Sequence, residues 1–384
     1  MISISEKQNC SGCHACASIC PKDCISITAD SEGFWYPCVD KSKCIDCGLC
    51  EKACSIINPL SSKSNPDAYA CYNKDDEIRM QSSSGGVFTL FAEYVIQQGG
   101  VLFGAVFDDD FNVIHSFIGK EQDLYKFRCS KYVQSKIGGT YSQAKDFLEH
   151  GKKVLFTGTP CQIAGLKAYL SKDYVNLICQ DIICHGVPSP KVWGKYLSEC
   201  EKRQQSSAKH IDFRNKQDGW QNYKLSISFK NGITYMKPKN SYIMAFLNNI
   251  SLRPSCYACE FKTLNRLSDI TLADFWGIKS IMPEMFDDKG VSLVLINSDK
   301  GEAVFKAISD KLVYKEANIN EAIKNNPSAI QSSPIHPKRD YFFENLEHAS
   351  IDQLVKICCR QSMSIRIKNF GYHVGSKLKR MLIK

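Results

Sequence analysis

The sequence predicts an α+β protein with a small cysteine-rich N-terminal domain, a larger α/β domain and a helical, basic C-terminal tail. Two cysteine runs of the same spacing lie within the first 58 residues. Segments typical of strands and helices alternate from residue 68 to about 300, and positive charge gathers beyond residue 335. A Ser/Pro/Asn-rich connector at 58–66 separates the first two parts. We therefore expect domains at 1–60, 66–335 and 336–384.

The two cysteine runs share the spacing C-x2-C-x2-C-x3-C, which in bacterial ferredoxins holds two [4Fe–4S] clusters. The eight cysteines are Cys10, Cys13, Cys16, Cys20, Cys44, Cys47, Cys50 and Cys54, with Pro21 after the first run. In this pattern the fourth cysteine of each run ligates the other cluster. We therefore expect Cys54 to join the first three cysteines and Cys20 to join the second three. Each fourth cysteine is expected at the start of a helix.

Zinc is the alternative occupant of these runs, because C-x2-C pairs also form tetrahedral zinc sites. Zinc sites usually combine two pairs some distance apart, so four cysteines this dense, twice over, favour iron–sulfur clusters. Such clusters need reduced thiolates, and residues 1–9 carry Glu6 and Lys7 without the apolar stretch of a secretory signal. The sequence therefore predicts a cytoplasmic protein in an anaerobic setting.

The composition fits a globular protein with a sizeable core. The chain has 384 residues, of which 43% are hydrophobic, and a mean hydropathy of −0.26. No run of about eighteen apolar residues occurs, so we expect no membrane span.

The net charge of +9 is concentrated at the C-terminal end. Residues 336–384 hold ten Lys and Arg against four acidic residues, and 341–358 and 363–383 have the pattern of amphipathic helices. A basic end of this kind could contact an anionic membrane surface or an acidic redox protein such as ferredoxin. The alternative is an ordinary solvated helical face. We expect no nucleic-acid partner, because no motif with interleaved aromatic residues accompanies the charge.

Apolar runs bounded by turn residues predict the strands of the first two domains. They lie at 24–28, 34–38, 68–72, 100–107, 153–157, 175–183 and 268–277, with a hairpin at 223–236 that turns at Asn231-Gly232. Helical periodicity predicts one helix from the N-cap Ser84 to Gly99-Gly100 and another from about 159 to 170.

Three segments carry side chains suited to a phosphate-bearing cofactor. Ser84, Gly85 and Gly86 open a helix, where backbone N–H groups and glycines favour bound anions. Residues 129–135 contain the cation of Lys131 together with a phenol, an amide and two hydroxyls. Residues 157–162 form a turn from strand to helix. Taken singly, each segment could also be a capped helix start or a surface loop.

Four further cysteines, Cys161, Cys184, Cys256 and Cys259, form a plausible third [4Fe–4S] site. Cys161 begins a helix, where thiolates are stabilised. The alternatives are a zinc site, a redox-active disulfide or buried inert thiols. His185 and Asp274 are candidates for proton transfer, and Trp276 could stack on a ring; a buried histidine, a capping carboxylate and a core tryptophan are the alternatives.

As an ordered set, these motifs resemble the coenzyme F420 hydrogenase/dehydrogenase beta-subunit family over residues 68–300, with a ferredoxin module in front. The motifs are Ser-Gly-Gly at 84–86, Ser-Lys-Tyr-Val-Gln-Ser at 130–135, Thr-Gly-Thr-Pro-Cys-Gln at 157–162, Cys-His-Gly at 184–186, Phe-Arg-Asn-Lys at 213–216, Cys-Tyr-Ala-Cys at 256–259 and Ala-Asp-Phe-Trp-Gly at 273–277. Phe-Arg-Asn-Lys departs from the more acidic family version, so Asn215 is given no role.

The resemblance implies an α/β domain that binds FAD, next to iron–sulfur clusters. It places the cofactor at Ser84, Gly85, Gly86, Lys131, Tyr132, Gln134, Ser135, Thr157, Gly158, Thr159 and Gln162. The expected function is an oxidoreductase that passes electrons between a low-potential carrier, ferredoxin or a reduced deazaflavin, and a small-molecule substrate. Coenzyme F420 is a candidate cofactor. The alternatives are a non-catalytic electron-transfer subunit of a larger complex and an accessory protein of surface-polysaccharide biosynthesis.

Overall fold

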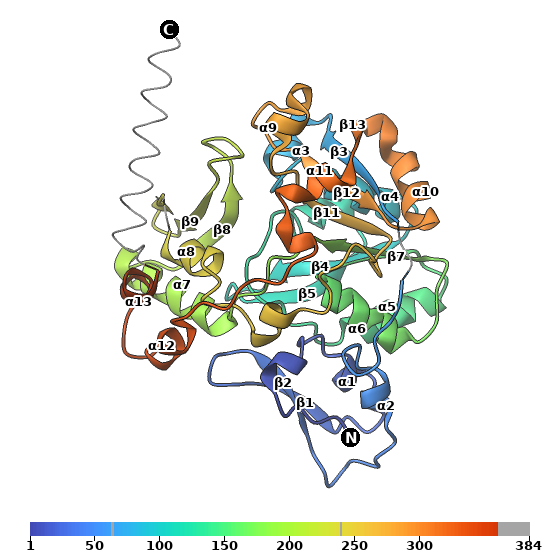
Figure 1. Cartoon of the computed structure of the whole chain (residues 1–384), viewed down its shortest axis with the longest axis vertical. Coiled ribbons are helices and arrows are strands. Elements are labelled where there is room, and N and C mark those ends of the chain that lie inside the picture. Colours follow the sequence, from blue (N-terminus) through green and yellow to red (C-terminus); the bar gives the residue numbers. More distant parts are fainter. Residues whose placement is uncertain (63–64, 239, 360–384) are drawn as a thin grey trace.

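The computed structural model describes residues 1–62, 65–238 and 240–359. It contains a cysteine-rich N-terminal module, a large mixed sheet covered by helices, and a lobe built on a smaller sheet (Figure 1). The mixed α and β architecture agrees with the predicted α+β class.

The N-terminal module consists of a hairpin and two short helices. Its elements are α1 (Ala15–Ser18), β1 (Ile25–Ala29), β2 (Trp35–Val39) and α2 (Leu49–Lys52). The two strands confirm those expected at 24–28 and 34–38, and they pair antiparallel, with Ile25 opposite Val39. The helices are placed differently from our expectation, because Cys20 and Cys54 follow the ends of α1 and α2 rather than beginning a helix. Each four-residue helix contains the third cysteine of its run, Cys16 or Cys50, and ends two residues before the fourth.

The large sheet has eight strands in the order β13-β3-β12-β11-β7-β6-β4-β5. The strands are β3 (Asp67–Asn73), β4 (Val101–Phe107), β5 (Val113–Ile118), β6 (Val154–Thr157), β7 (Leu177–Ile182), β11 (Ile270–Asp274), β12 (Ser292–Ile296) and β13 (Leu312–Ala317). The four central strands β11, β7, β6 and β4 are parallel, and the outer strands pair antiparallel. The expected strands of this domain are all present, and the carboxyl ends of the four parallel strands share one edge.

Helices cover both faces of this sheet. The helices beyond the module are α3 (Asp76–Met80), α4 (Val87–Gln97), α5 (Thr140–Glu149), α6 (Pro160–Leu170), α7 (Pro190–Gln204), α8 (Ser241–Leu247), α9 (Ile278–Ile281), α10 (Asp299–Ile308), α11 (Ile319–Lys324), α12 (Arg339–Glu344) and α13 (Ile351–Cys358). Leu102 and Leu155 are buried with α4 and α10, whereas Phe103 and Phe156 are buried with α5 and α6. This alternation follows from the two-residue period of a strand.

The helix after the serine-rich segment starts later than predicted. Its N-cap is Gly86, with φ of 77°, and α4 begins at Val87. Ser84 instead donates its hydroxyl to the carbonyl oxygen of Val291 at 2.9 Å. The left-handed backbone at Gly86 is the reason, since a glycine enters that conformation without the cost that a serine would have.

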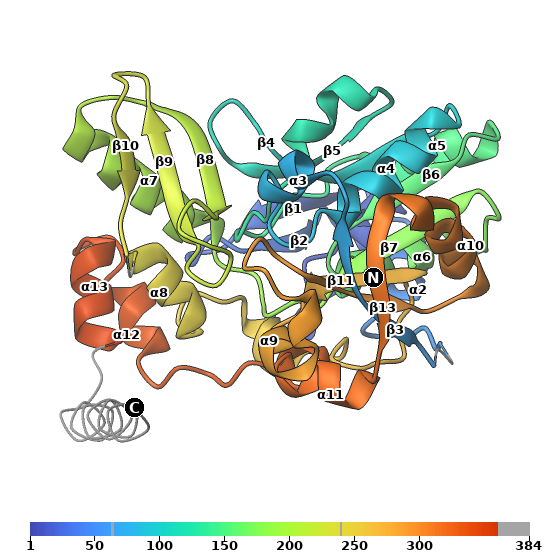
Figure 2. The same cartoon turned by 90° about the horizontal axis from the view of Figure 1, so that it is seen from above.

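The smaller lobe is formed by β8 (Ala208–Asn215), β9 (Lys224–Phe229) and β10 (Thr234–Met236) with α7, α8, α12 and α13. Figure 2 shows it standing beside the large sheet. The β9–β10 hairpin confirms the predicted turn, and β8 adds a third strand. Phe342 and Leu354 are buried in its core, so residues up to 359 of the predicted tail pack on this lobe. The expected continuous helix at 341–358 is interrupted between α12 and α13, and the expected helix at 363–383 lies outside the described residues.

The N-terminal module is fastened to the rest of the chain by buried charged side chains. Arg339 of α12 forms a two-pronged ion pair with Glu32 in the β1–β2 turn, at 2.8 and 2.5 Å. Arg253, which is fully buried, donates to the carbonyl oxygens of Cys10 and Trp35, both at 2.9 Å. These contacts join segments more than 200 residues apart and fix the module beneath the large sheet (Figure 1).

Candidate functional site

The principal cavity lies at the carboxyl ends of the parallel strands and has a volume of about 570 Å³. Ala105 of β4, Thr157 of β6, Ile182 of β7 and Asp274 of β11 contribute to its wall. Open α/β sheets bind ligands at this edge, because the loops after successive parallel strands open there. The volume falls within the range of small-molecule and cofactor sites.

One wall of the cavity is hydroxyl-rich and comes from two separate loops. The hydroxyls of Ser83 and Ser130 are hydrogen-bonded at 3.0 Å, and the Ser83 oxygen also accepts the Ser130 N–H at 2.7 Å. Lys131 donates to the carbonyl oxygens of Arg128 and Cys129, at 3.0 and 3.2 Å, and its burial lowers its pKa to about 8. The adjoining N-terminus of α4 adds backbone N–H groups that have no partner within the helix. This wall is suited to an anion.

Lys216 binds the backbone of the serine-rich loop at 82–84. Its ammonium group donates to the carbonyl oxygens of Arg79, Lys289 and Ser84, at 2.6, 2.7 and 2.9 Å. Burial lowers the pKa of Lys216 to about 8. Because Ser84 lines the cavity, the lysine links the position of this wall to two other segments of the chain.

Arg214 is the most important cavity residue to which the sequence analysis gave no role. It is 2% exposed, and it donates to Asp274 Oδ1 at 2.8 Å and to the Ser83 carbonyl oxygen at 3.1 Å. Its guanidinium carbon lies 3.8 Å from the ring centre of Tyr223. Asp274 also accepts from the indole of Trp220, at 2.8 Å. The sequence does contain a sign of this role, because Arg214 belongs to the Phe-Arg-Asn-Lys motif at 213–216. Its burial in the structure then indicates a specific partner, since an arginine is rarely buried without one.

Asp274 and Trp276 are therefore fixed by their neighbours. Both donors to Asp274 bind its Oδ1 atom, and Arg214 forms an ion pair with it at 2.8 Å. Trp276 stacks on Trp220 with ring centres 4.9 Å apart and nearly parallel planes. Asp274 thus holds Arg214 in place, while its expected part in proton transfer stays a prediction.

A buried histidine, His115, lies against the strand-to-helix turn. Its Nε2 atom lies 3.0 Å from the carbonyl oxygen of Thr157, which only accepts, so Nε2 carries the proton. Burial lowers the pKa of His115 to about 4. Its Nδ1 atom, Oε1 of Gln180 and Nε of Arg214 are buried without a partner among the described residues, and all three side chains line the cavity. Unpaired polar atoms of this kind are typical of a site that is built for a polar ligand.

The turn between β6 and α6 is held by a capping box. The Thr159 N–H donates to Gln162 Oε1 at 2.9 Å, and the Gln162 amide donates to the Ser135 hydroxyl at 2.9 Å. The turn is thereby connected to the 129–135 segment. Gly158, Thr159, Gln162 and Ser135 all line the cavity.

The four cysteines of the expected third site converge beside this cavity. Cys161 is close enough to Cys184, Cys256 and Cys259 that their charges raise the pKa of its thiol, after burial as the main cause. Burial likewise raises the pKa of Cys256 to about 12, with Cys184 as the next cause. Cys184 also lines the cavity. Four cysteines that come together from separate segments of the chain fit a [4Fe–4S] cluster. Such a cluster would lie next to whatever molecule occupies the cavity.

His185 follows Cys184 in the chain and also lines the cavity. Its Nε2 atom is 2.6 Å from Asn249 Oδ1, and its ring packs edge-on against Phe246 with centres 4.9 Å apart. Burial lowers the pKa of His185. The side chain lines the cavity, as its expected role in proton transfer requires, and that role stays a prediction.

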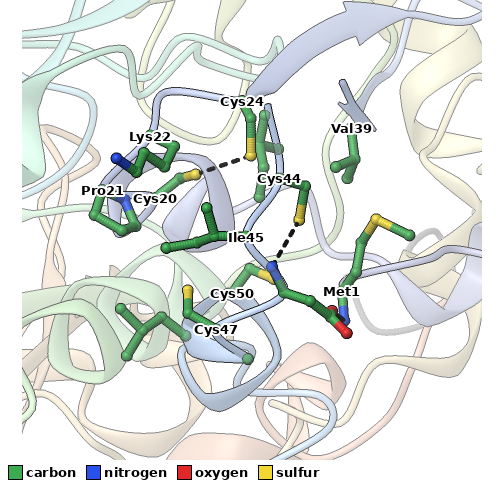
Figure 3. A pocket seen from close by; sticks show the side chains of 14 residues that line it. Met1, Cys20, Pro21, Lys22, Cys24, Val39, Cys44, Ile45, Cys47 and Cys50 are labelled. Carbon is green, nitrogen blue, oxygen red and sulfur yellow. Dashed lines mark hydrogen bonds and ion pairs between the residues drawn. The ribbon is translucent and has the colours of Figure 1, made fainter. Parts of the chain in front are cut away.

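The cysteines of the N-terminal module fall into two groups. The charges of Cys13, Cys10 and Cys54, in that order, raise the pKa of Cys16 in addition to its burial, which is the main cause. Cys20, Cys44, Cys47 and Cys50 line one small cavity (Figure 3). The structure thus brings Cys54 to the first three cysteines and Cys20 to the second three. Cys24, which the sequence analysis did not consider, lies in the same small cavity with its sulfur 3.3 Å from that of Cys20.

Two of the residues expected to bind the cofactor lie elsewhere. Gln134 is buried facing the N-terminal module, where its Oε1 accepts from Arg253 at 3.2 Å. Gly85 packs between β3 and β12, where an added Cβ would meet the carbonyl oxygen of Cys71 at 2.5 Å. The other nine expected residues line the cavity, namely Ser84, Gly86, Lys131, Tyr132, Ser135, Thr157, Gly158, Thr159 and Gln162.

Among residues 1–62, 65–238 and 240–359, no three His, Cys, Asp or Glu side chains are arranged to hold a single metal ion. Within the same ranges, no helix is long and apolar enough to cross a membrane.

Comparison with known proteins identifies the central part of the chain. Residues 151–322 match the model of a family described as the C terminus of the coenzyme F420 hydrogenase/dehydrogenase beta subunit. This part of the chain is similar to that family. The match covers Cys161, Cys184, Arg214 and Asp274, and therefore much of the cavity wall.

Two curated proteins are similar to parts of this chain. One is the coenzyme F420-dependent sulfite reductase of Methanocaldococcus jannaschii, 24% identical over 159 residues, 41% of this chain and 24% of the relative. The other is NADH-quinone oxidoreductase subunit I of Pelobacter propionicus, 36% identical over 69 residues, 16% of this chain and 37% of the relative. The chain therefore spans about a quarter of the length of the sulfite reductase and somewhat more than a third of the length of the quinone oxidoreductase subunit.

A solved structure titled as the F420-reducing [NiFe] hydrogenase complex from Methanosarcina barkeri is also similar. The sequences are 18% identical, the TM-score is 0.45, and the match covers 78% of this chain and 92% of the other.

Proposed function

We propose that this protein is an iron–sulfur flavoprotein oxidoreductase that passes electrons between a low-potential carrier and a small-molecule substrate. The carrier would be ferredoxin or a reduced deazaflavin, and the cavity would hold FAD. The observation that best supports the proposal concerns Cys184. This residue lines the cavity and also belongs to the group of Cys161, Cys184, Cys256 and Cys259. This arrangement would put a one-electron centre beside the bound flavin.

The family match over residues 151–322 and the relatives support the general class of this proposal. The matched family is that of the F420 hydrogenase/dehydrogenase beta subunits, and one relative is named as F420-dependent. The second relative is a named subunit of a quinone oxidoreductase. These names make an iron–sulfur oxidoreductase the best-supported class and coenzyme F420 a candidate carrier.

The side chains of the cavity define what the protein itself would contribute. Bound FAD supplies a junction between carriers of single electrons and two-electron hydride chemistry. The backbone N–H groups at the start of α4, with Lys131 and Arg214, would hold its phosphates. The turn at 157–159 would fix the opposite wall, and His185 and Asp274 are the proposed proton-handling groups.

The metal content of anaerobically purified protein tests this function. We expect about twelve irons and one FAD per chain, from three four-iron clusters and one flavin. Cys161→Ser should lower the iron content by about four. Cys200→Ser, which removes a cysteine buried in the smaller lobe, is the matched control and should leave iron unchanged. About eight irons in the native protein would mean that only two clusters are bound and that these four cysteines hold none: Cys161, Cys184, Cys256 and Cys259.

Turnover then separates an enzyme from an electron-transfer subunit. The isolated protein should oxidise or reduce a small-molecule substrate with a chemical electron donor alone. Iron without flavin, and no turnover without a partner protein, would favour the subunit instead.

A further inference from the structure

Helix α6 contains a glycine in its interior that the helix itself does not need. Gly165 lies midway along Pro160–Leu170. Glycine weakens the middle of a helix relative to alanine, because it loses more backbone freedom on folding. A tertiary contact should therefore explain its presence.

That contact is made with the N-terminal module. A Cβ atom at Gly165 would lie 2.8 Å from Cβ and 3.0 Å from Sγ of Cys13, and 2.9 Å from the hydroxyl of Tyr141. The backbone of α6 thus touches one of the cysteines of the first group. Any side chain at this position would move Cys13, Tyr141 or the helix.

The same helix carries a cysteine of the cavity-side group. Cys161 precedes Gly165 by four residues, so both lie on one face of α6, about 6 Å apart along the axis. Gly165 is therefore the point at which the module approaches the helix that bears Cys161.

A second contact joins the same two cysteine groups. Arg253 donates to the Cys10 carbonyl oxygen and precedes Cys256 by three residues. On the module side, Gly12 has φ of 70°, and a Cβ there would lie 2.5 Å from Gln134 Nε2 and 2.9 Å from the Arg253 guanidinium. At two separate points, Gly165 and Gly12, the missing side chain of a glycine thus allows close packing between the module and the segments that carry the cysteines beside the cavity.

We infer that Gly165 is a positioning residue for electron transfer, which sets how closely the Cys10, Cys13, Cys16 and Cys54 group approaches the group that contains Cys161. This inference rests on the proposed function, because it needs a redox centre at each group. The route runs from the module through α6 to the cavity. Each transfer moves one electron, so an external one-electron donor must supply two electrons for each flavin that is reduced.

The test is the Gly165→Ala protein with Gly194→Ala as its matched control. Gly194 lies within α7, and a Cβ there would meet nothing within 4 Å. Reduced methyl viologen supplies the electrons, and two equivalents are oxidised for each flavin bleached. In stopped flow we expect Gly165→Ala to slow flavin bleaching by about tenfold or more, since small displacements of reacting groups have large effects on rates. Gly194→Ala should match the native rate.

Magnetic resonance supplies a readout that does not depend on turnover. In fully reduced protein, the spin–spin splitting between the two centres should weaken in Gly165→Ala and stay native in Gly194→Ala. The thermal midpoints should diverge too, with Gly194→Ala raised by its better helix propensity and Gly165→Ala lowered. Native bleaching and native splitting in Gly165→Ala would overturn the inference.

A double variant separates the two contacts of Gly165. Tyr141→Phe removes the hydroxyl that the new methyl group would meet but leaves the conflict with Cys13. If the glycine positions Cys13, Gly165→Ala/Tyr141→Phe should still transfer electrons slowly, even where it is more stable than the single variant. Recovery of the native rate would show that the glycine only makes room for Tyr141. Native protein without iron or flavin would instead contradict the proposed function, before any variant is compared.

Discussion

Nε of Arg253 donates to the carbonyl oxygen of Cys10 at 2.9 Å, across 243 positions of sequence. The same guanidinium donates to Trp35 and Gln134, and the side chain is fully buried. A single arginine therefore joins the backbone of the first cysteine run to the segment that leads to Cys256. This is one of two contacts between the two sets of candidate redox ligands; the other is Gly165 against Cys13.

Replacement of Arg253 by methionine should loosen the N-terminal module. The change leaves the Cys10 and Trp35 carbonyl oxygens buried without a donor, so we expect the free energy of unfolding to fall by about 3–5 kcal/mol. Urea denaturation measures this, and limited proteolysis near the 58–66 connector reports release of the module. The control is Arg203→Gln, which breaks an exposed ion pair with Asp352 at 3.4 Å and should change stability by less than about 1 kcal/mol. Equal effects of the two changes would contradict the bridging role.

Asp274→Asn should destabilise the cavity wall through Arg214. The variant keeps an oxygen for the Trp220 indole but leaves a buried guanidinium without its counter-charge, which costs about 3–5 kcal/mol. We expect weaker retention of FAD together with lower stability, measured by flavin titration of the apoprotein and by denaturation. Asp310→Asn, at an exposed position, is the control. Unchanged stability with altered proton transfer would instead favour a direct chemical role for Asp274.

Lys131 should make flavin binding depend on pH. Burial lowers its pKa to about 8, with Cys129 and Asp212 as the nearby groups that oppose the shift. Between about pH 8 and the ordinary lysine value, the unfolded chain binds the extra proton, so this lysine makes stability rise with pH in that window. Phosphate binding should show the opposite trend, because it needs the charged ammonium group.

Fluorescence titration of the apoprotein with FAD checks this expectation. Affinity should fall as the pH rises through about 8 in the native protein, and Lys131→Met should bind FAD more weakly without that step. Lys216 also has a pKa lowered to about 8, so any contribution of its own would persist in Lys131→Met. Exposed Lys136 gives the control variant Lys136→Met. A full pH step in Lys131→Met would remove Lys131 from the site.

Pairs of cysteine variants test the grouping of the N-terminal ligands. Cys20→Ser and Cys47→Ser fall in one group, so the double variant should lose about four irons, as either single variant does. Cys20→Ser combined with Cys13→Ser affects both groups and should lose about eight. Iron analysis of these proteins decides the matter. If Cys20→Ser and Cys13→Ser together removed only about four irons, the two cysteines would share a cluster, which the structure contradicts.

Much of the fold was accessible from the sequence because its signals are local. Short apolar runs mark β4, β6 and β7, and the Asn231-Gly232 turn marks the hairpin. The start of α4 was misplaced, because a serine is a common N-cap and the left-handed conformation of Gly86 is not visible in the sequence. The exact helix start depends on how the loop packs on β12.

The cavity could be predicted only where its residues follow the ends of strands. Thr157 and Asp274 end parallel strands, and these strands necessarily bring them to one edge of the sheet. Arg214 comes from the smaller lobe, and Gln134 faces the module although its neighbour Ser135 faces the cavity. Neither placement follows from local spacing, since each depends on how two distant parts of the chain dock.

The sequence by itself determined the two cysteine runs and the alternation of strands and helices, because covalent spacing and short-range periodicity are written along the chain. The tertiary structure decided which thiols meet, which buried cation faces the cavity, and why α6 has a glycine at 165. These features depend on contacts such as Cys13 with Gly165 and Arg253 with Cys10. Contacts between segments more than 100 residues apart are set by packing, which no local pattern specifies.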